Sequence, residues 1–304
     1  MTGLVLTGRN SIFTVRAGEE RLTCRIKGKT LDLPDRSYNP LAPGDVVDLG
    51  SVDTVNGSAS IIARHPRTSE FGRFNRKRAA IQTLGANIDQ VVCLMSTKSP
   101  GFRTRFVDRV AVLAEFYDLP FVLIVSKSDL GPGKAAQEAT KYAGIGYRAL
   151  PCSLSDPDSV EAVRLLLRNR RSILVGQSGV GKSSLINAVC GRDVQRIGAI
   201  SRRYDRGRHT TTAAILLSES DIEVVDTPGI RELDCRHVPT TILAQLYRDM
   251  QPYDGHCALG DCTHRHEPGC AVIAAVAAGR VERTRHESYV RLYDEIEECG
   301  EQSA

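Results

Sequence analysis

Apolar and polar residues alternate over short runs in the first 66 residues, and Gly, Asn, Pro and Asp separate the runs. This pattern is typical of short β-strands that bury one face. Five such runs with no helical pattern between them predict a small barrel of the oligonucleotide-binding type, although another small β-domain fits equally well. The predicted strands are Leu4–Thr7, Ser11–Arg16, Arg21–Lys27, Asp45–Leu49 and Ser58–Ala63.

Later in the chain the pattern changes to apolar runs that alternate with helical segments. Helical spacing is clearest in Arg103–Tyr117 and Pro157–Asn169. Alternating strands and helices predict a mostly parallel sheet that is covered on both faces. The apolar runs are Val91–Met95, Phe121–Val125, Tyr147–Pro151, Ile173–Val175 and Ile222–Val225.

From about residue 236 the pattern is helical and is interrupted by a cluster of Cys and His. The predicted fold class is therefore multidomain: a β-barrel over residues 1–68, an α/β domain over 69–235 and a mostly helical, metal-binding domain over 236–304. The acidic last stretch, Asp294–Ala304, is expected to fray.

The composition is typical of a globular protein without a membrane span. Hydrophobic residues make up 41% of the 304 residues and charged residues 25%, but no run of about 18 apolar residues occurs. Met1 to Phe13 lack the pattern of a signal peptide. The nine cysteines are an odd number and mostly scattered, which predicts a reducing cytoplasm rather than a disulfide framework. Nothing in the sequence suggests more than a monomer.

Positive charge is concentrated in two segments, although the net charge is only +4. Arg64–Arg78 carries six Lys or Arg against Glu70, and Arg202–Arg208 carries four Arg against Asp205. Such blocks suit a polyanion such as RNA, but a solvated basic loop has the same composition.

A complete phosphate-binding loop stands between a predicted strand, Ser172–Val175, and a predicted helix, Ser184–Cys190. Its glycines let backbone amides turn toward a β-phosphate, and the helix N-terminus adds partial positive charge. Lys182 is expected to be catalytic by bridging the β- and γ-phosphates, and the Ser183 hydroxyl to ligate Mg²⁺. The expected nucleotide-binding residues here are Gly176, Gln177, Ser178, Gly179, Val180, Gly181, Lys182, Ser183 and Ser184.

Two further segments are expected to sense the γ-phosphate. Asp226 and Gly229 belong to Asp-Thr-Pro-Gly after a predicted strand, where Asp226 can hold Mg²⁺ through water and Gly229 can donate its amide. Thr211 lies in a Thr run before the predicted strand Ala213–Leu217, and is the third expected Mg²⁺ ligand. A Thr run is also a common start of a strand.

Recognition of guanine requires a carboxylate that accepts from N1–H and the exocyclic amine. Asp129 fits, because it follows the strand Phe121–Val125 at the edge where ligands bind in α/β sheets. Lys127 would pack along the base, and Ser126 occupies the position before it. At the end of the next strand, Cys152-Ser153-Leu154 could supply a backbone amide to guanine O6, and Ser153 is the expected contact. These residues favour GTP over ATP.

The glutamine that orients the attacking water in common GTPases is replaced by Ile230, whose side chain cannot hydrogen-bond to water. His209, just before the Thr run, is the nearest alternative, and a neutral imidazole can position or activate water. A surface His in a loop is the competing interpretation. Slow intrinsic turnover and activation by a partner are predicted.

Cys257, Cys262, His264 and Cys270 supply three thiols and one imidazole within fourteen residues. This set completes the tetrahedral shell of a structural Zn²⁺ and leaves no open position for substrate. His256 and His266 are alternative fourth ligands. Free cysteines in a loop would be the interpretation without metal.

These motifs together resemble the RsgA family, also called YjeQ, of circularly permuted GTPases that depend on the small ribosomal subunit. The resemblance implies an RNA-binding barrel, a permuted GTPase domain and a zinc domain. It also implies partners in GTP or GDP and the small (30S) subunit with its 16S-type rRNA, a role in late maturation and stimulated hydrolysis. Family members carry a catalytic histidine at the position of His209. Ser126 and Leu154 depart from the family, which usually has Asn or Thr and a small residue there. Its motifs are Ala86–Gln90, Asp108-Arg109, Gly176–Ser183, Gly207–Thr212, Asp226–Gly229, Cys257–Cys270 and Ser288–Leu292.

The base-reading motif precedes the phosphate loop in this chain, whereas it follows the loop in most GTPases. This order predicts a circularly permuted domain in which loss of the γ-phosphate repositions the zinc domain. Ile230 and Ser126 would also suit an RNA-binding scaffold that holds nucleotide without hydrolysis. Asp129 and the Cys/His cluster argue against a third alternative, a P-loop ATPase.

Overall fold

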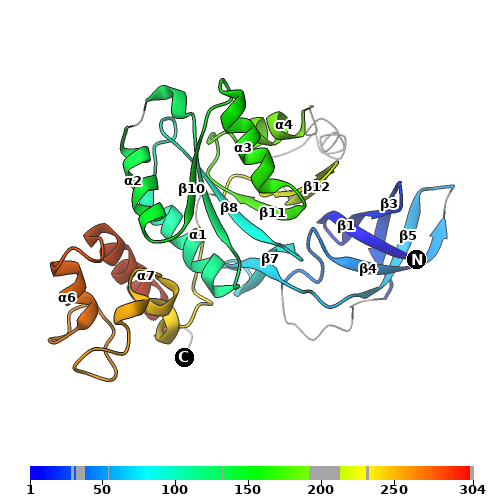
Figure 1. Cartoon of the computed structure of the whole chain (residues 1–304). Helices are drawn as coiled ribbons and strands as arrows, with labels where there is room; N and C mark the ends of the chain where they lie inside the picture. The colour runs from blue at the N-terminus through cyan, green and yellow to red at the C-terminus, as the bar shows by residue number, and fades with distance from the viewer. Residues whose placement is uncertain are drawn as a thin grey trace.

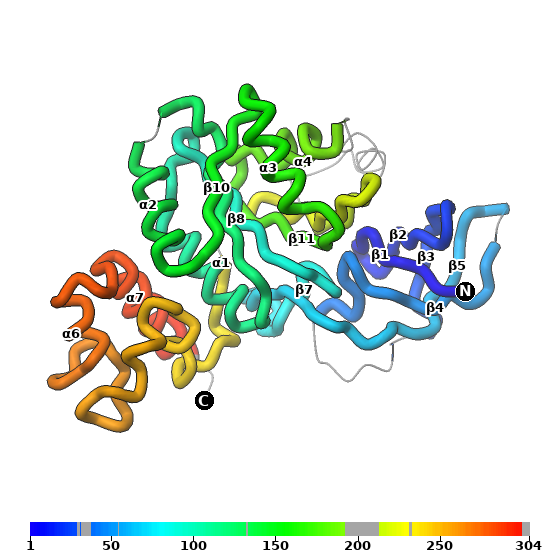
Figure 2. Tube along the Cα trace, viewed as in Figure 1, coloured from blue at the N-terminus to red at the C-terminus, as the bar shows by residue number. Residues whose placement is uncertain are grey.

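The computed structural model of the chain describes residues 1–28, 31, 38–53, 55–131, 133–191, 213–230 and 233–301. An N-terminal barrel and a C-terminal region lie on opposite sides of a central α/β region, as the cartoon and the tube both show (Figures 1 and 2). Within the described residues, no helix combines the length and the apolar character that are needed to cross a membrane.

The first five strands form the predicted barrel. Their order is β1-β2-β3-β5-β4, and pairing of β1 with β4 closes the ring. Side chains that alternate along the strands fill it, among them Val5, Val15 and Ile61, which are fully buried. The strands are β1 (Thr2–Arg9), β2 (Ile12–Ala17), β3 (Glu20–Ile26), β4 (Val46–Asp53) and β5 (Ser58–Arg64).

The central sheet has the order β10-β9-β8-β11-β13-β12, and its first five strands are parallel. The strand that leads into the phosphate loop, β11, therefore lies between β8 and β13, although β8, β9 and β10 all precede it in the chain. This arrangement is the permuted order that the motifs predict. The strands are β8 (Gln90–Ser96), β9 (Phe121–Ser126), β10 (Arg148–Cys152), β11 (Arg170–Val175), β12 (Ile215–Glu219) and β13 (Ile222–Asp226).

Helices cover both faces of this sheet (Figure 1). Along β8 the buried side chains alternate between two cores: Val91, Cys93 and Met95 join the one on the side of α1, and Val92 and Leu94 join the one on the side of α3 and α4. A continuous apolar run is the expected sequence of a strand that is buried on both faces. The helices are α1 (Thr104–Phe116), α2 (Gly133–Gly144), α3 (Pro157–Leu167) and α4 (Lys182–Cys190).

The basic segment Arg64–Arg78 is not a simple solvated loop, because it contains the first strand of a hairpin, β6 (Glu70–Asn75) with β7 (Ala80–Ala86). Arg67 is buried: its guanidinium donates to Asp45 at 2.8 and 2.9 Å and to Glu70 at 2.6 Å. The interpretation of Arg67 as a cation available to a polyanion is therefore wrong.

The C-terminal region packs against α1 and shares its core. The expectation that Asp294–Ala304 frays is wrong as far as Glu301, because α7 continues to that residue and its acidic side chains pair with Arg109 and Arg265. The elements of this region are η2 (Thr240–Leu246), η3 (Gln251–Tyr253), α6 (Ala271–Ala277) and α7 (Arg283–Glu301).

Candidate nucleotide site and metal centre

The sequence motifs converge at one edge of the central sheet. The base-reading motif follows β9, the phosphate loop follows β11 and the Asp-Thr-Pro-Gly segment starts at the end of β13. Since these strands are parallel, their carboxyl ends meet at the same edge, where ligands bind in open α/β sheets.

The phosphate loop connects β11 to α4 through backbone that favours glycine. Gly179 and Gly181 have φ angles of 84° and 98°, in the left-handed region. A Cβ on Gly176 would lie 2.5 Å from the carbonyl oxygen of Leu94, so the loop passes too close to β8 for a side chain. The glycine spacing thus follows from the path of the backbone.

Lys182 is buried at the start of α4, and its ammonium donates to the carbonyls of Gly176 at 2.7 Å and Gln177 at 3.1 Å. Burial lowers the pKa of Lys182, while the nearby charge of Asp226 acts in the opposite direction. The loop thus holds the Lys182 ammonium beside the N-terminus of α4, where an anion would also bind.

A cavity of about 400 Å³ lies between the phosphate loop and the segment after β13. Gly229 comes so close to the loop that a Cβ there would lie 2.9 Å from the Ser178 amide nitrogen. Ile230 is buried in the core and does not line the cavity. The lining residues are Ser178, Gly179, Gly181, Lys182, Ser183, Ser184, Ala213, Ile215, Asp226, Thr227, Pro228 and Gly229.

The base-reading motif is tied directly to the phosphate loop. The Ser126 hydroxyl lies 2.6 Å from the carbonyl oxygen of Val180, and the Lys127 ammonium donates to that of Gly179 at 3.0 Å. Asp129 is exposed, and it accepts a hydrogen bond of 2.6 Å from the Ser153 hydroxyl. Asp129 and Ser153, on consecutive loops of the sheet edge, thus form one polar pair.

Two residues that the sequence motifs do not include also contact the site. Thr97, after β8, donates its hydroxyl to the carbonyl of Lys127 at 2.7 Å, and Ser159 accepts from the Ser153 amide at 3.0 Å. The rule that strand ends meet at one edge would have identified Thr97. His209, Thr211 and the basic block Arg202–Arg208 lie outside the described residues.

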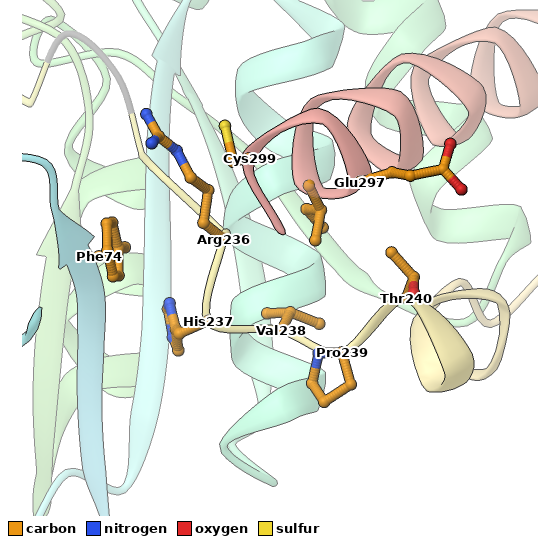
Figure 3. Close-up of a pocket in the computed structure, with 9 residues that line it drawn as sticks. Phe74, Arg236, His237, Val238, Pro239, Thr240, Glu297 and Cys299 are labelled. Atoms are coloured by element: carbon orange, nitrogen blue, oxygen red, sulfur yellow. The ribbon is translucent and has the colours of Figure 1, made fainter. Parts of the chain in front are cut away.

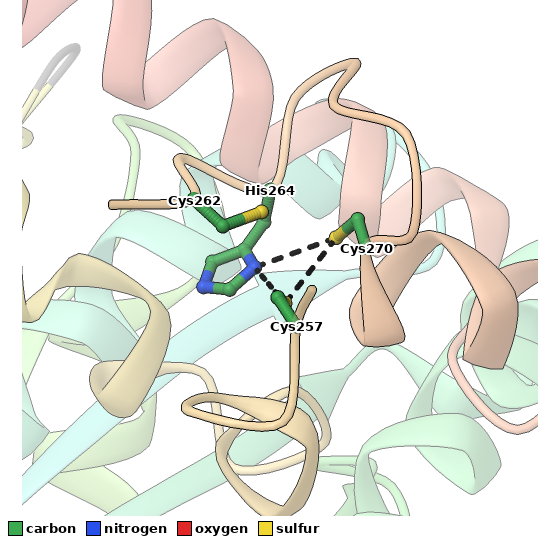
Figure 4. A group of neighbouring side chains, drawn as sticks. All are labelled: Cys257, Cys262, His264 and Cys270. Carbon is green, nitrogen blue, oxygen red and sulfur yellow. Dashed lines mark hydrogen bonds between the residues drawn. The ribbon is translucent and has the colours of Figure 1, made fainter. Parts of the chain in front are cut away.

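The four residues of the Cys/His motif come together in the C-terminal region (Figure 4). Their ligand atoms all lie within 4.8 Å of one another. The Nδ1 atom of His264 is 3.4 Å from the Cys257 sulfur and 3.5 Å from the Cys270 sulfur. His256 and His266 are exposed and do not belong to the group.

The surroundings of the group suit a metal site. The other ring nitrogen of His264, Nε2, lies 3.0 Å from the Asp254 carboxylate, which would fix the ring and its tautomer. The amide of Ala271 donates to the Cys257 sulfur and that of Ile273 to the Cys270 sulfur. Three soft sulfurs and an oriented imidazole fit Zn²⁺.

A second cavity, of about 380 Å³, lies beside the chain that follows the Asp-Thr-Pro-Gly segment (Figure 3). Phe74 of the β6–β7 hairpin, Arg236 and His237 after β13, and Glu297 of α7 line it. It shares no lining residue with the nucleotide cavity. The β6–β7 hairpin, the chain after β13 and α7 thus meet at this cavity.

Comparison with known proteins agrees with this geometry. The family model described as RsgA GTPase matches residues 64–236. A protein of Borreliella afzelii (strain PKo) named Small ribosomal subunit biogenesis GTPase RsgA is 34% identical over 298 residues, which cover 96% of this chain and 95% of that protein. The protein of the same name from Chlorobaculum parvum is 34% identical over 312 residues, which cover 98% of this chain and 99% of that protein.

Solved structures show the same fold. YjeQ from Thermotoga maritima superposes with a TM-score of 0.71 at 28% identity, covering 97% of this chain and 98% of that one. YloQ, described as a circularly permuted GTPase, superposes with a TM-score of 0.66 at 24% identity, covering 98% of this chain and 95% of that one.

Proposed function

The chain belongs to the RsgA family of GTPases, and from that premise we propose that it hydrolyses GTP on the small ribosomal subunit, assists late maturation of that subunit and leaves it after hydrolysis. The names of the curated relatives support the choice of partner. The observation that carries the proposal is the cavity in which the phosphate loop meets Asp226 and Gly229. The protein would act in the cytoplasm as a monomer.

In this proposal GTP occupies that cavity. Lys182 would exchange its contacts with Gly176 and Gln177 for the β- and γ-phosphates. Ser183 and Asp226 both line the cavity and would hold Mg²⁺, whose charge would offset that of the phosphates. Thr211 remains the predicted third ligand. Asp129 would accept from N1–H and the amine of guanine, and Ser153 would help to hold its carboxylate.

Hydrolysis would need a group other than Ile230 to position water, because Ile230 is buried in the core. His209 remains the prediction for that role. Single-turnover hydrolysis by His209→Ala would test it: the account expects a large loss of rate with GTP affinity retained. A wild-type rate would remove His209 from the mechanism.

RNA contact would rest on fewer cations than the sequence suggests, since Arg67 is buried in an ion pair. Lys77 and Arg78 are exposed at the turn of the hairpin and, with Arg202–Arg208, are the candidates for phosphate contacts with 16S-type rRNA. Binding to the subunit should then weaken as salt rises. Affinity that stays constant over a wide range of salt would contradict an electrostatic contact.

The Cys/His group would hold one structural Zn²⁺. With three cysteines and His264 as ligands, no position would remain for a substrate. The metal would then stabilise the loop between η3 and α6, and it would have no part in hydrolysis.

GTP turnover with and without small subunits tests the proposal. We expect slow turnover by the protein alone and strong acceleration by subunits, with little activity in Lys182→Ala. Equal rates with and without subunits would reject the proposal. That result would favour the alternative that Ile230 and Ser126 suggest, an RNA-binding scaffold with nucleotide that is held but not hydrolysed.

A further inference from the structure

We propose that Ser126 makes this protein indifferent to the N7 atom of guanine, so that the base is selected through its Watson–Crick edge, where Asp129 would accept from N1–H and the amine. The inference rests on the proposed binding of guanine nucleotide beside Asp129. It concerns the residue at which this chain departs from the Asn or Thr that is usual there.

Guanine offers two edges to a protein. Its N1–H and exocyclic amine are donors that suit a carboxylate such as Asp129, whereas N7 is an acceptor that requires a donor. An asparagine in the place of Ser126 would bring two N–H donors on one amide. One of them could hold the phosphate loop while the other reads N7.

Serine has a single hydroxyl hydrogen, and the structure indicates where it goes. Ser126 is 8% exposed, and its Oγ lies 2.6 Å from the carbonyl oxygen of Val180 and 3.1 Å from that of Met95. Both neighbours are acceptors, so the hydrogen is committed to one of them. The shorter distance assigns it to Val180 in the phosphate loop.

The neighbouring donors are also engaged. The Lys127 ammonium has three hydrogens and lies 2.6, 3.0 and 3.3 Å from the carbonyl oxygens of Ser99, Gly179 and Lys98. Thr97 directs its hydroxyl to the carbonyl of Lys127. Ser126, Lys127 and Thr97 therefore hold the base-reading and phosphate loops together, and none of the three has a side-chain hydrogen left for N7.

Turning Ser126 toward N7 would have a cost. The Val180 carbonyl would lose its short hydrogen bond to Ser126, and an unmade bond at a buried position costs about as much as the new bond would contribute. The exchange brings no net stabilisation, so the hydroxyl is expected to stay on the loop when nucleotide binds.

The test compares GDP with 7-deaza-GDP, in which a C–H replaces N7, by calorimetric titration of the full chain. Diphosphates avoid turnover during the titration. For the wild type we expect dissociation constants within about twofold of each other, because no hydrogen bond is lost. For Ser126→Asn we expect a preference for GDP of about fivefold, the effect of one added hydrogen bond.

Ser126→Thr is the matched control, because it keeps one hydroxyl and should keep the wild-type ratio. Ser126→Ala should weaken both ligands by the same factor, since it removes only the tie to Val180. If Ser126→Asn does not fold, the wild-type ratio decides the question alone.

A wild type that binds 7-deaza-GDP fivefold or more weakly than GDP would overturn the inference, because another donor, such as the Ser128 hydroxyl, would then read N7. The same titration with ADP separates this failure from a failure of the proposed function. If GDP binds no better than ADP, guanine is not recognised at all, and the proposed function falls together with the inference.

Discussion

The barrel and the C-terminal region are attached to the central α/β region in different ways. The barrel has its own core, and of its buried residues in the described part of the chain only Leu6 joins the large central core, with the half-buried Leu4 packed against it. It meets β12 and β13 of the central sheet through polar contacts: Thr7 pairs with Ile215, its hydroxyl donates to the Ala214 carbonyl at 2.8 Å, and Arg16 approaches Glu223 at 3.3 Å. Its contact with the β6–β7 hairpin adds the buried Arg67, which donates to Asp45 of the barrel and to Glu70.

The described residues of the C-terminal region, in contrast, form no separate core. Val110 of α1, Tyr247 and Tyr289 of the C-terminal region all belong to one hydrophobic cluster. Within it Arg285, 4% exposed, donates to Asp108 of α1 at 2.5 Å and to Asp249 at 2.6 Å. The sequence places a domain boundary near residue 236, but the two sides of that boundary share one core and are not expected to move independently.

This difference bears on how a nucleotide signal would leave the site. The strand after the Thr run, β12, pairs with β1 of the barrel. The chain after Gly229 is held to the C-terminal region instead, since Arg109 contacts both the Leu233 carbonyl and Glu295 of α7. A displaced C-terminal region would expose the shared core. In place of the zinc-domain movement that the motif order predicts, we therefore expect the barrel to be the part that moves more.

Removal of metal should have the largest effect on stability. It should destabilise α1 as well as the C-terminal region, because the two share one core. Binding of a structural Zn²⁺ contributes many kcal/mol in small domains, of the order of 10. We expect Cys262→Ser to lose bound zinc and lower the melting temperature of the central and C-terminal regions together. Metal content and calorimetry would be measured on the same sample.

Cys299→Ser is the matched control, a cysteine of the same region outside the metal group. It should keep one equivalent of zinc and a nearly unchanged melting temperature. If the central region of zinc-free Cys262→Ser melts at the same temperature as in the wild type, the shared core does not couple the stability of the central and C-terminal regions.

Arg285→Leu should be the next most damaging change. It leaves Asp108 and Asp249 buried without their common cation, which costs about 3–5 kcal/mol. Urea unfolding would measure this loss. Arg16→Leu at the barrel junction is the comparison, and its partly exposed pair with Glu223 should contribute less than about 1 kcal/mol. Equal losses for the two variants would remove the contrast between the junctions.

Acid should lower the stability of the contact between α1 and the chain after β13, where His237 lies beside Tyr117. Burial lowers the pKa of His237 to about 4, and Asp234 opposes this shift in part. The unfolded chain has a His pKa of about 6.5 and so binds a proton at higher pH than the folded chain does. The contribution of His237 to stability is thus fully present above pH ~6.5 and falls as the pH drops toward ~4.

His237→Phe should lack this part of the pH dependence. The ring nitrogen lies 3.1 Å from the Tyr117 hydroxyl, so at pH 7.5 the variant should lose about 1 kcal/mol. Toward pH 5 the unfolding free energies of wild type and variant should converge. Parallel curves over that range would mean that His237 is not held neutral by burial.

The smallest effect is expected at the barrel junction. Thr7→Val removes one hydrogen bond, to the Ala214 carbonyl, and should lower the free energy of unfolding by about 1 kcal/mol. GTP turnover by the protein alone should not change. A loss of several kcal/mol would instead indicate that the barrel is held as firmly as the C-terminal region.

The sequence predicted those features that depend on local pattern. Val91–Met95 is a strand because it is apolar throughout. Gly176 to Ser183 form a phosphate loop because Gly176 passes close to β8 and the backbone at Gly179 and Gly181 has positive φ. The hairpin of β6 and β7 was missed because Arg73 and Asn75 obscure its alternation. Arg67 with Asp45, and Asp108 with Arg285, are pairs distant in sequence, and no local pattern encodes such contacts.

Hydrogen exchange of the full chain in mild denaturant, with GDP bound, tests the central contrast most directly. We expect the amides of α1 (Thr104–Phe116) and α7 (Arg283–Glu301) to open together at the same free energy, and those of the barrel strands to open separately at a lower free energy. If α7 opens well below α1, the shared core does not unite the two regions, and the account is contradicted.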